Sequence, residues 1–315
     1  MLYAPCPGNC SHNRHAALPR CSPTWPDRSR TLRPMKFAVI AHQLTETNVA
    51  LSARGWPGAR SHLIPPRKAL LELGAGDIAL NRLDVSRDLD SVEDGIWSIT
   101  QLEAQGVRVF NRPPALLSCH DKLLTARLLR RAGVPHPRTR RLERARSADA
   151  LRYPVVAKPR FGSWGRDVEL CTDRAALERY VATMRKRSWW RIGGIVQELV
   201  RPLGIDLRVI VAGGNVVGAA SRTAAPGEWR TNVAVGGTPN SAVPPPDACE
   251  LAVAATSALG IDFAGVDLLP DGNSWVVLEV NGAVDVRPMY SLETDVYTAA
   301  LRSLQTTTEE QLLLA

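Results

Sequence analysis

The chain has 315 residues, and 39 Lys and Arg against 31 Asp and Glu give it a formal net charge of +8. This length is too great for one ordinary domain, so we expect two or three. Hydrophobic residues make up 45% of the chain, and no apolar run approaches the ~20 residues of a membrane span. We therefore expect no membrane span. Because half of the excess charge lies in residues 1–34, the charge of the remaining chain is too small to support nucleic-acid binding.

Residues 1–34 are rich in proline and show almost no apolar periodicity. We expect them to form a disordered extension ahead of Met35. The alternative is a small zinc-binding arm, because cysteine and histidine are zinc ligands. The residues concerned are Cys6, Cys10, His12 and His15. Three later cysteines are isolated in apolar or helical surroundings, which indicates reduced thiols in a cytoplasmic protein: Cys119, Cys171 and Cys249.

Residues 35–118 alternate short apolar strands with helical stretches. Residues 36–41 and 78–80 read as strands, and a helical run over residues 91–105 stops at Gly106 before a strand at 107–110. Strand, helix and strand in turn predict a parallel α/β domain. The segment has no glycine fingerprint for a dinucleotide, so we interpret it as a scaffold that faces the substrate.

Two lysines precede features that suit phosphate. Lys122 opens a helix that ends at Gly133, and Lys158 closes a buried strand over residues 153–159. A loop with Gly162, Ser163 and Gly165 follows at once, and its glycines let backbone N–H groups approach an anion. A solvated surface lysine and an ordinary hairpin turn are the alternatives.

A second group of polar residues lies around two further strands. Residues 195–200 form a strand whose end can pair with an adenine edge, and Asp206 and Arg208 on the next strand suit ribose hydroxyls and a phosphate. In a glycine-rich stretch further on, Arg222 and Arg230 are typical of carboxylate or phosphate clamps. Solvated arginines are the alternative.

The last motif is a hairpin of residues 263–269 and 275–282 around Pro270-Asp271-Gly272-Asn273. Asp267 and Glu279 stand among apolar residues, with Asn281 two positions on, so we expect a hard-oxygen magnesium site. A strict two-residue turn would place Asp267 and Glu279 on opposite faces. We therefore predict a five-residue loop, or a bulge, that sets Asp267 directly opposite Glu279. Two solvated acids on an exposed face are the alternative.

The order of these motifs resembles the ATP-grasp superfamily, and within it the RimK-type α-L-glutamate ligases, over residues 36–304. The resemblance implies an α/β (α+β) class: a parallel N-terminal α/β domain and two α+β subdomains that sandwich ATP. The expected parts are residues 1–34, the extension; 35–118, the N-terminal domain; 119–192, the central subdomain; 193–305, the C-terminal subdomain; and 306–315, a tail.

The resemblance also implies a role for each matching residue. The ATP phosphates would be bound by Lys122, Lys158 and a lid that contains Gly162, Ser163 and Gly165. Adenine and ribose would be bound by Gln197, Glu198, Leu199, Val200 and Asp206. The reacting carboxylate and the γ-phosphate would lie near Arg222, Arg230 and Asn232, and Mg²⁺ or Mn²⁺ would be bound by Asp267, Glu279 and Asn281. Two departures are Trp164 in the glycine loop and residues 282–287, which lie near the acceptor site in relatives.

The implied activity is ATP-dependent amide-bond formation through an acyl phosphate, adding L-glutamate or another amino acid to a carboxylate acceptor. Such chemistry needs positioning and charge neutralisation but no side-chain nucleophile. The expected partners are therefore small molecules, a peptide or a protein C-terminus, with a homo-oligomer (dimer or tetramer) also open. The alternatives are an ATP-binding regulator without turnover and a natural-product peptide ligase that uses a different amino acid.

Overall fold

The computed structural model describes residues 33–201 and 203–313 of the chain. Residues Pro34–Ala315 form one compact unit, to which the following description refers. The proposed extension and the alternative zinc arm lie outside the described residues, apart from residues 33 and 34. Across the described part, no helix is long and apolar enough to cross a membrane.

A four-stranded parallel sheet opens the described chain, in the order β2-β1-β3-β4. Residues of β1 alternate between two cores, since Phe37 and Val39 face one side and Ala38 and Ile40 the other. Both faces are therefore covered, as a parallel sheet requires. The elements are β1 (Lys36–Ile40), α1 (Glu46–Arg54), β2 (Arg60–Ile64), α2 (Pro66–Glu72), β3 (Ile78–Asn81), α3 (Ile96–Ala104) and β4 (Arg108–Phe110).

Helix α3 is shorter than the helix predicted over residues 91–105. It begins only after Gly95, whose φ of 122° is not helical. The preceding residues turn back along the chain, and Glu93 donates its backbone N–H to the Asp84 carbonyl at 2.8 Å. This loop brings Asp84 and Glu93 together beyond the end of β3.

The central part is an antiparallel sheet in the order β5-β8-β6-β7. Its core includes Tyr180 and Trp189, both almost fully buried. Strand β8 lies in this sheet, so the sheet extends beyond residue 192, where we expected the boundary. The elements here are α4 (Pro113–His120), α5 (Lys122–Arg131), β5 (Thr139–Leu142), η1 (Ala145–Ala148), β6 (Val155–Pro159), β7 (Glu169–Cys171), α6 (Arg174–Met184), η2 (Ser188–Ile192) and β8 (Gly194–Glu198).

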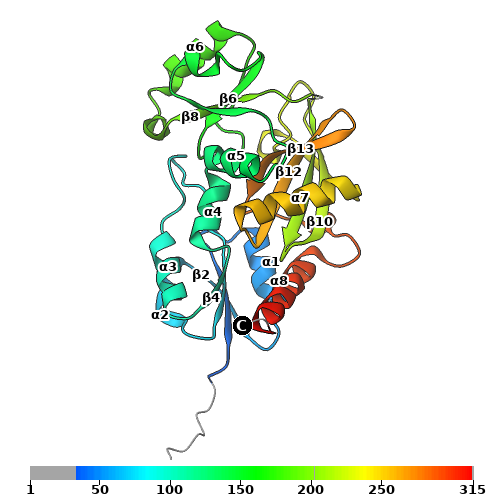
Figure 1. Cartoon of the computed structure of the whole chain (residues 1–315). Helices are drawn as coiled ribbons and strands as arrows, with labels where there is room; N and C mark the ends of the chain where they lie inside the picture. The colour runs from blue at the N-terminus through cyan, green and yellow to red at the C-terminus, as the bar shows by residue number, and fades with distance from the viewer. Residues whose placement is uncertain (1–32, 202, 314–315) are drawn as a thin grey trace, which may run out of the picture. The chain divides into compact units, whose positions relative to one another are not determined.

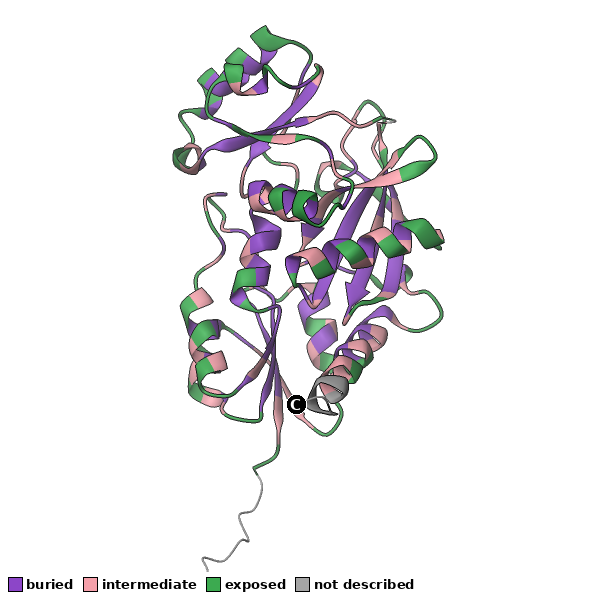
Figure 2. Cartoon of the chain, in the orientation of Figure 1, coloured by how far each residue is buried: buried purple, intermediate pink, exposed green. Residues whose placement is uncertain are grey.

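The last part is a five-stranded antiparallel sheet in the order β11-β10-β9-β12-β13. Helix α7 lies across this sheet, and α8 contacts α1 (Figure 1). Strands of this sheet are buried, while much of the outer surface of α6 and α7 is exposed (Figure 2). The elements are β9 (Ile205–Ala212), β10 (Asn215–Thr223), η3 (Val233–Val235), β11 (Thr238–Ser241), α7 (Pro246–Leu259), β12 (Phe263–Asp271), β13 (Ser274–Asn281), η4 (Pro288–Tyr290) and α8 (Val296–Leu313). Most of the expected tail, residues 306–315, is thus the end of α8.

The β12–β13 hairpin sets Asp267 directly opposite Glu279, as predicted. The prediction of a five-residue loop is wrong, because Asp271 pairs with Ser274 and leaves a two-residue turn. The alternative prediction, a bulge, is confirmed. The register shifts between Asp267 and Leu268, and Leu278 is the extra residue of β13. One extra residue restores the face of every later side chain, so both carboxylates point the same way.

Candidate active site

A cleft runs between the central sheet and the β9–β13 sheet. Strands β6 and β8 line it on one side, and β9, β10, β12 and β13 on the other. Most residues assigned to the site from the sequence line this cleft: Lys122, Lys158, Gly162, Ser163, Gly165, Gln197, Glu198, Leu199, Val200, Asp206, Arg222, Arg230, Asn232, Asp267 and Glu279. The two remaining residues, Arg208 and Asn281, line a second cavity that adjoins the cleft.

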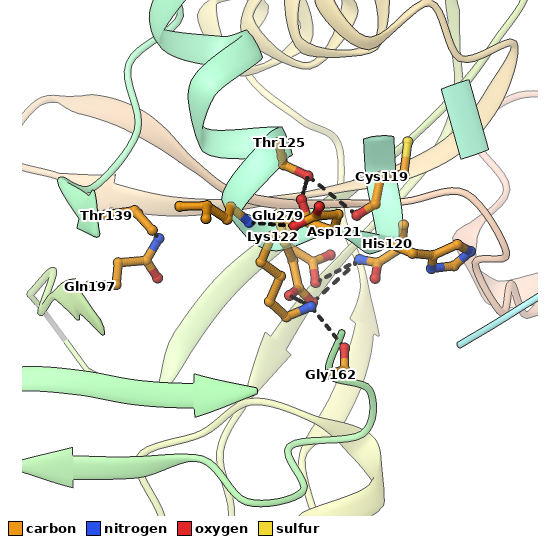
Figure 3. A network of polar contacts seen from close by, with 12 residues as sticks. Cys119, His120, Asp121, Lys122, Thr125, Thr139, Gly162, Gln197 and Glu279 are labelled. Atoms are coloured by element: carbon orange, nitrogen blue, oxygen red, sulfur yellow. Dashed lines mark hydrogen bonds and ion pairs between the residues drawn. The ribbon is translucent and has the colours of Figure 1, made fainter. Parts of the chain in front are cut away.

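Two lysines lie on the wall of the cleft. Lys122 is the first residue of α5, where Asp121 caps the helix. Its Nζ lies 3.0 Å from Glu279 Oε2 and donates to the Gly162 carbonyl at 2.8 Å (Figure 3). Lys158 on β6 is only 6% exposed. Its burial, with the nearby charge of Lys122, lowers the pKa of Lys158 to about 8. Both lysines thus face the cleft from the side of the glycine loop.

The carboxylate pair is already surrounded by cations. Arg208 binds both oxygens of Asp267, at 2.7 and 2.9 Å, because the two residues are directly opposite on β9 and β12. Arg222 lies 2.9 Å from the same carboxylate. Burial opposes ionisation, but both arginines outweigh it and hold the pKa of Asp267 below its usual value. The same balance of burial against Lys122 lowers the pKa of Glu279.

Asp206, expected on the ribose, is buried and engaged within the protein. Arg222 binds both of its oxygens, at 2.7 and 2.5 Å, and Thr231 donates its hydroxyl to one of them. The pair forms because Asp206 and Arg222 are cross-strand neighbours on β9 and β10. Arg222 therefore bridges Asp206 and Asp267, which fixes its position at the junction of the two cavities.

The second half of the glycine loop is anchored at two positions. The Asp167 carboxylate accepts a hydrogen bond from Trp189 Nε1 at 2.8 Å. Two residues earlier, the Gly165 carbonyl accepts from Arg230 at 2.9 Å, while Glu228 binds the same guanidinium. Trp164, just before Gly165, has a φ of 57° and remains 41% exposed. Arg230 thus fixes the loop to the β10 side of the cleft.

The segment expected to hold adenine comprises the end of β8 and the residues that follow it. Gln197 on β8 donates its side-chain amide to Thr139 Oγ1 of β5 at 2.9 Å (Figure 3). Leu199 and Val200 follow the last residue of the strand, and both line the cleft.

The donors on the hairpin fit a magnesium ion by their chemistry. Two carboxylates and an amide are hard oxygen ligands of the kind this ion prefers. Asn281 turns its Nδ2 toward Asp267 and Glu279, at 3.3 and 3.5 Å. A half-turn of the amide presents its oxygen at the same place. Among residues 33–201 and 203–313, no group of three or more His, Cys, Asp or Glu could hold a metal ion.

The second cavity holds residues to which the sequence assigned no individual role, although Asp285 and Arg287 belong to residues 282–287, already noted beside the acceptor site in relatives. Asp84 follows β3, His120 ends α4, and Asp285 and Arg287 follow β13. The cavity shares Trp164, Arg222, Asn232 and Glu279 with the cleft, so the two are continuous. One sequence feature could have identified Asp84 as a site residue. It comes just after the carboxyl end of a predicted parallel strand, where ligands bind in open α/β sheets.

A parallel domain followed by two antiparallel sheets that enclose a cleft with lysines and paired carboxylates defines an ATP-grasp protein. D-alanine–D-alanine ligase from Bacillus anthracis, solved with ATP, matches with a TM-score of 0.64 at 17% identity, covering 88% of this chain and 99% of that chain. A RimK domain ATP-grasp protein from Sphaerobacter thermophilus gives 0.64 at 23% identity, covering 85% and 98%.

Sequence comparison defines the family. The model of the RimK-like ATP-grasp domain matches residues 119–304. Glutamate–LysW ligase ArgX of Sulfurisphaera tokodaii is 34% identical over 211 residues, which are 64% of this chain and 74% of that protein. The chain belongs to the RimK-like ATP-grasp family of ATP-dependent carboxylate–amine ligases, as the order of its motifs predicted.

Proposed function

We propose that this protein joins an amino acid, L-glutamate first among them, to a carboxylate acceptor by ATP-dependent amide-bond formation. The observation that carries the proposal is the convergence of Lys122, Lys158 and the Asp267–Glu279 pair on one cleft. The choice of glutamate rests on the similarity to ArgX, a glutamate–LysW ligase. The acceptor belongs to the class of carboxylates.

The reaction has two steps. An acceptor carboxylate oxygen attacks the γ-phosphorus of ATP, and ADP leaves with the bonding electrons of the broken P–O bond. The amino-acid nitrogen then attacks the acyl carbon, and phosphate leaves. The charge that develops on transferring oxygens is offset by nearby cations. In this chain we assign that task to Lys122, Lys158 and Arg230.

Asp267, Glu279 and Asn281 are the residues that would hold Mg²⁺, which supplies neutralisation of phosphate charge when bound. Arg208 and Arg222 prearrange the Asp267 carboxylate, and Lys122 pairs with Glu279. Each carboxylate has about four lone-pair positions and keeps some free beside its cation. The glycine loop, fixed by Arg230, covers the phosphates in the proposed complex and limits access of water.

The test is a screen for acid-dependent turnover. Purified protein, ATP and Mg²⁺ are incubated with candidate acids and hydroxylamine, which traps an acyl phosphate as a hydroxamate. Amino acids then replace hydroxylamine, and mass spectrometry identifies the amide. We expect hydroxamate and ADP only when an acid is present, and neither from Glu279→Gln.

Binding of ATP without acid-dependent hydroxamate across the panel would overturn the proposal and favour the ATP-binding regulator. An amide with an amino acid other than glutamate would keep the reaction and favour the peptide ligase. The cytoplasmic location and the homo-oligomer expected from the sequence stay predictions.

A further inference from the structure

The second cavity lies where the strand order of the N-terminal sheet reverses. From β1 the chain passes to β2 on one side and to β3 on the other. The crevice beyond the carboxyl ends of such strands is the usual ligand position in open parallel sheets. Asp84 lies there, three residues after the last residue of β3, and faces the same cavity as Asn232 and Glu279 of the cleft.

Asp84 meets His120 across this cavity. His120 Nδ1 lies 4.0 Å from Asp84 Oδ1, and the His120 side chain is almost buried. The other ring nitrogen, Nε2, lies 3.0 Å from the Leu83 carbonyl, which only accepts hydrogen bonds. Nε2 therefore carries the proton. Burial lowers the pKa of His120 to about 4, so the ring is neutral and Nδ1 presents a lone pair toward Asp84.

Two hydrogen-bond acceptors thus face one another without a donor between them. Asp84 Oδ1 accepts from the Val85 N–H at 2.7 Å, and no described side chain donates to Asp84 Oδ2 or to His120 Nδ1. At a separation of 4.0 Å, a single nitrogen can lie within the ~2.7–3.2 Å of a hydrogen bond from both acceptors. An ammonium group has three donors and a positive charge, so it satisfies both acceptors at once.

The surroundings suit the rest of an amino acid. Arg287 lines the same cavity, is exposed, and has no ion pair among the described residues. It is a suitable partner for a substrate carboxylate. Arg82 is almost buried, and its Nη1 has no hydrogen-bond partner. It lines a smaller cavity together with Asp84 and Asp285. This fixed positive charge favours the ionised form of Asp84.

We propose that Asp84 and His120 bind the ammonium group of the amino-acid substrate, and that Asp84 accepts the proton this nitrogen must lose before it attacks the acyl phosphate. The inference rests on the proposed function. One proton passes from the ammonium nitrogen to an Asp84 oxygen, and the lone pair that this frees forms the new C–N bond. The C–O bond to phosphate breaks, phosphate leaves with that electron pair, and the departing phosphate takes the second proton that the nitrogen loses.

The electrostatics of Asp84 agree with this task. Burial raises the pKa of Asp84 to about 6, and the charges of Glu93 and Asp285 add to the rise while Arg82 opposes it. The remaining neighbour, His120, is neutral. A carboxylate with this pKa is ionised at neutral pH and is a better base than an ordinary one. The α-ammonium group of a free amino acid is almost fully protonated at that pH, so it needs such a base before its nitrogen can attack.

The first test separates the amine from the acyl phosphate. Hydroxylamine is largely uncharged at neutral pH, so it needs neither ammonium binding nor removal of a proton before it attacks. In Asp84→Asn we expect acid-dependent hydroxamate formation as in the wild type. The kcat/KM for the amino acid should fall on the order of 100-fold. Asp88→Asn, on the same loop but exposed and outside both cavities, is the matched control and should change neither rate.

The second test measures binding without turnover. Calorimetry in the presence of Mg²⁺ and a non-hydrolysable ATP analogue compares L-glutamate with glutarate, which lacks only the ammonium group. We expect the wild type and Asp88→Asn to prefer glutamate, and Asp84→Asn and His120→Phe to lose that preference. If the screen identifies another amino acid, that amino acid and its desamino analogue form the pair.

The outcomes separate this inference from the proposed function. If the wild type forms hydroxamate but Asp84→Asn keeps full amide formation, or keeps the preference for the amino acid over its desamino analogue, the role of Asp84 is wrong and the ligase stands. A parallel loss of hydroxamate and amide in Asp84→Asn also overturns the role, because it places Asp84 in the first step. A wild type without hydroxamate on any acid overturns both.

Discussion

Asp84 carries a charge that folding disfavours, and this makes a stability prediction that is independent of activity. The pKa of Asp84 rises from its ordinary 3.8 to about 6 on folding, chiefly through burial. A raised pKa means that the folded chain binds the proton more tightly than the unfolded chain. Asp84 therefore favours folding below pH ~4, where both states are protonated at this site, and this contribution is lost as the pH rises through about 6.

The size of the effect follows from the shift. About two pKa units correspond to roughly 3 kcal/mol, since each unit is about 1.4 kcal/mol. The Asp84 side chain is 25% exposed, so solvent screens part of this, and we expect roughly 1–3 kcal/mol. Asn has the same shape, keeps an oxygen for the Val85 N–H, and carries no charge. Asp84→Asn should therefore stabilise the protein at pH 7.5.

The assay is chemical denaturation followed by tryptophan fluorescence, at pH 7.5 and at pH 4. We expect Asp84→Asn to exceed the wild type in unfolding free energy at pH 7.5 and to match it at pH 4. Asp88→Asn, an exposed control, should stay within about 0.5 kcal/mol of the wild type at both values. A loss of stability in Asp84→Asn at pH 7.5, or an equal gain at both pH values, would refute the reasoning.

Two further substitutions test other parts of the site, and a third tests the contact between the end of β4 and the β12–β13 sheet. Lys158→Ala should raise the KM for ATP on the order of tenfold or more without loss of thermal stability, and unchanged steady-state kinetics would remove Lys158 from the site. Arg230→Lys keeps the charge but loses the fork that binds Glu228 and the Gly165 carbonyl, so amide formation should fall far more than ATP affinity measured by calorimetry. Equal losses would reassign Arg230 to the nucleotide. Asn111→Ala removes four buried side-chain hydrogen bonds, to Asp262, Phe263 and Gly282, and should cost roughly 3–5 kcal/mol in chemical denaturation. A cost below about 1 kcal/mol would show that these bonds are not needed.

Local patterns explain why many elements were predictable. The strand that carries Lys158 and the glycine loop after it depend only on residues that are adjacent in the chain. The β12–β13 hairpin was predictable for the same reason. Even its bulge followed from parity, because Asp267 and Glu279 can share a face only if one extra residue is inserted.

Contacts between distant strands were not predictable in this way. Arg208 was expected on a phosphate and Arg222 on the reacting carboxylate. Register places them opposite Asp267 and Asp206, where they bind those carboxylates. Nothing in the local sequence distinguishes a side chain that faces a ligand from one that faces a neighbouring strand. Asn111 was missed for a related reason, since its partners Phe263 and Gly282 are more than 150 residues away.

The sequence by itself determined the order of the elements and the family, because periodicity, turn residues and motif spacing depend on neighbours along the chain. Tertiary structure alone decided which charges meet. Asp84 and His120 lie in different parts of the chain, and only the contact of the end of α4 with the loop after β3 sets them 4.0 Å apart. In a buried cavity the free energy of a charge depends on the few groups within hydrogen-bond reach, and folding chooses those groups.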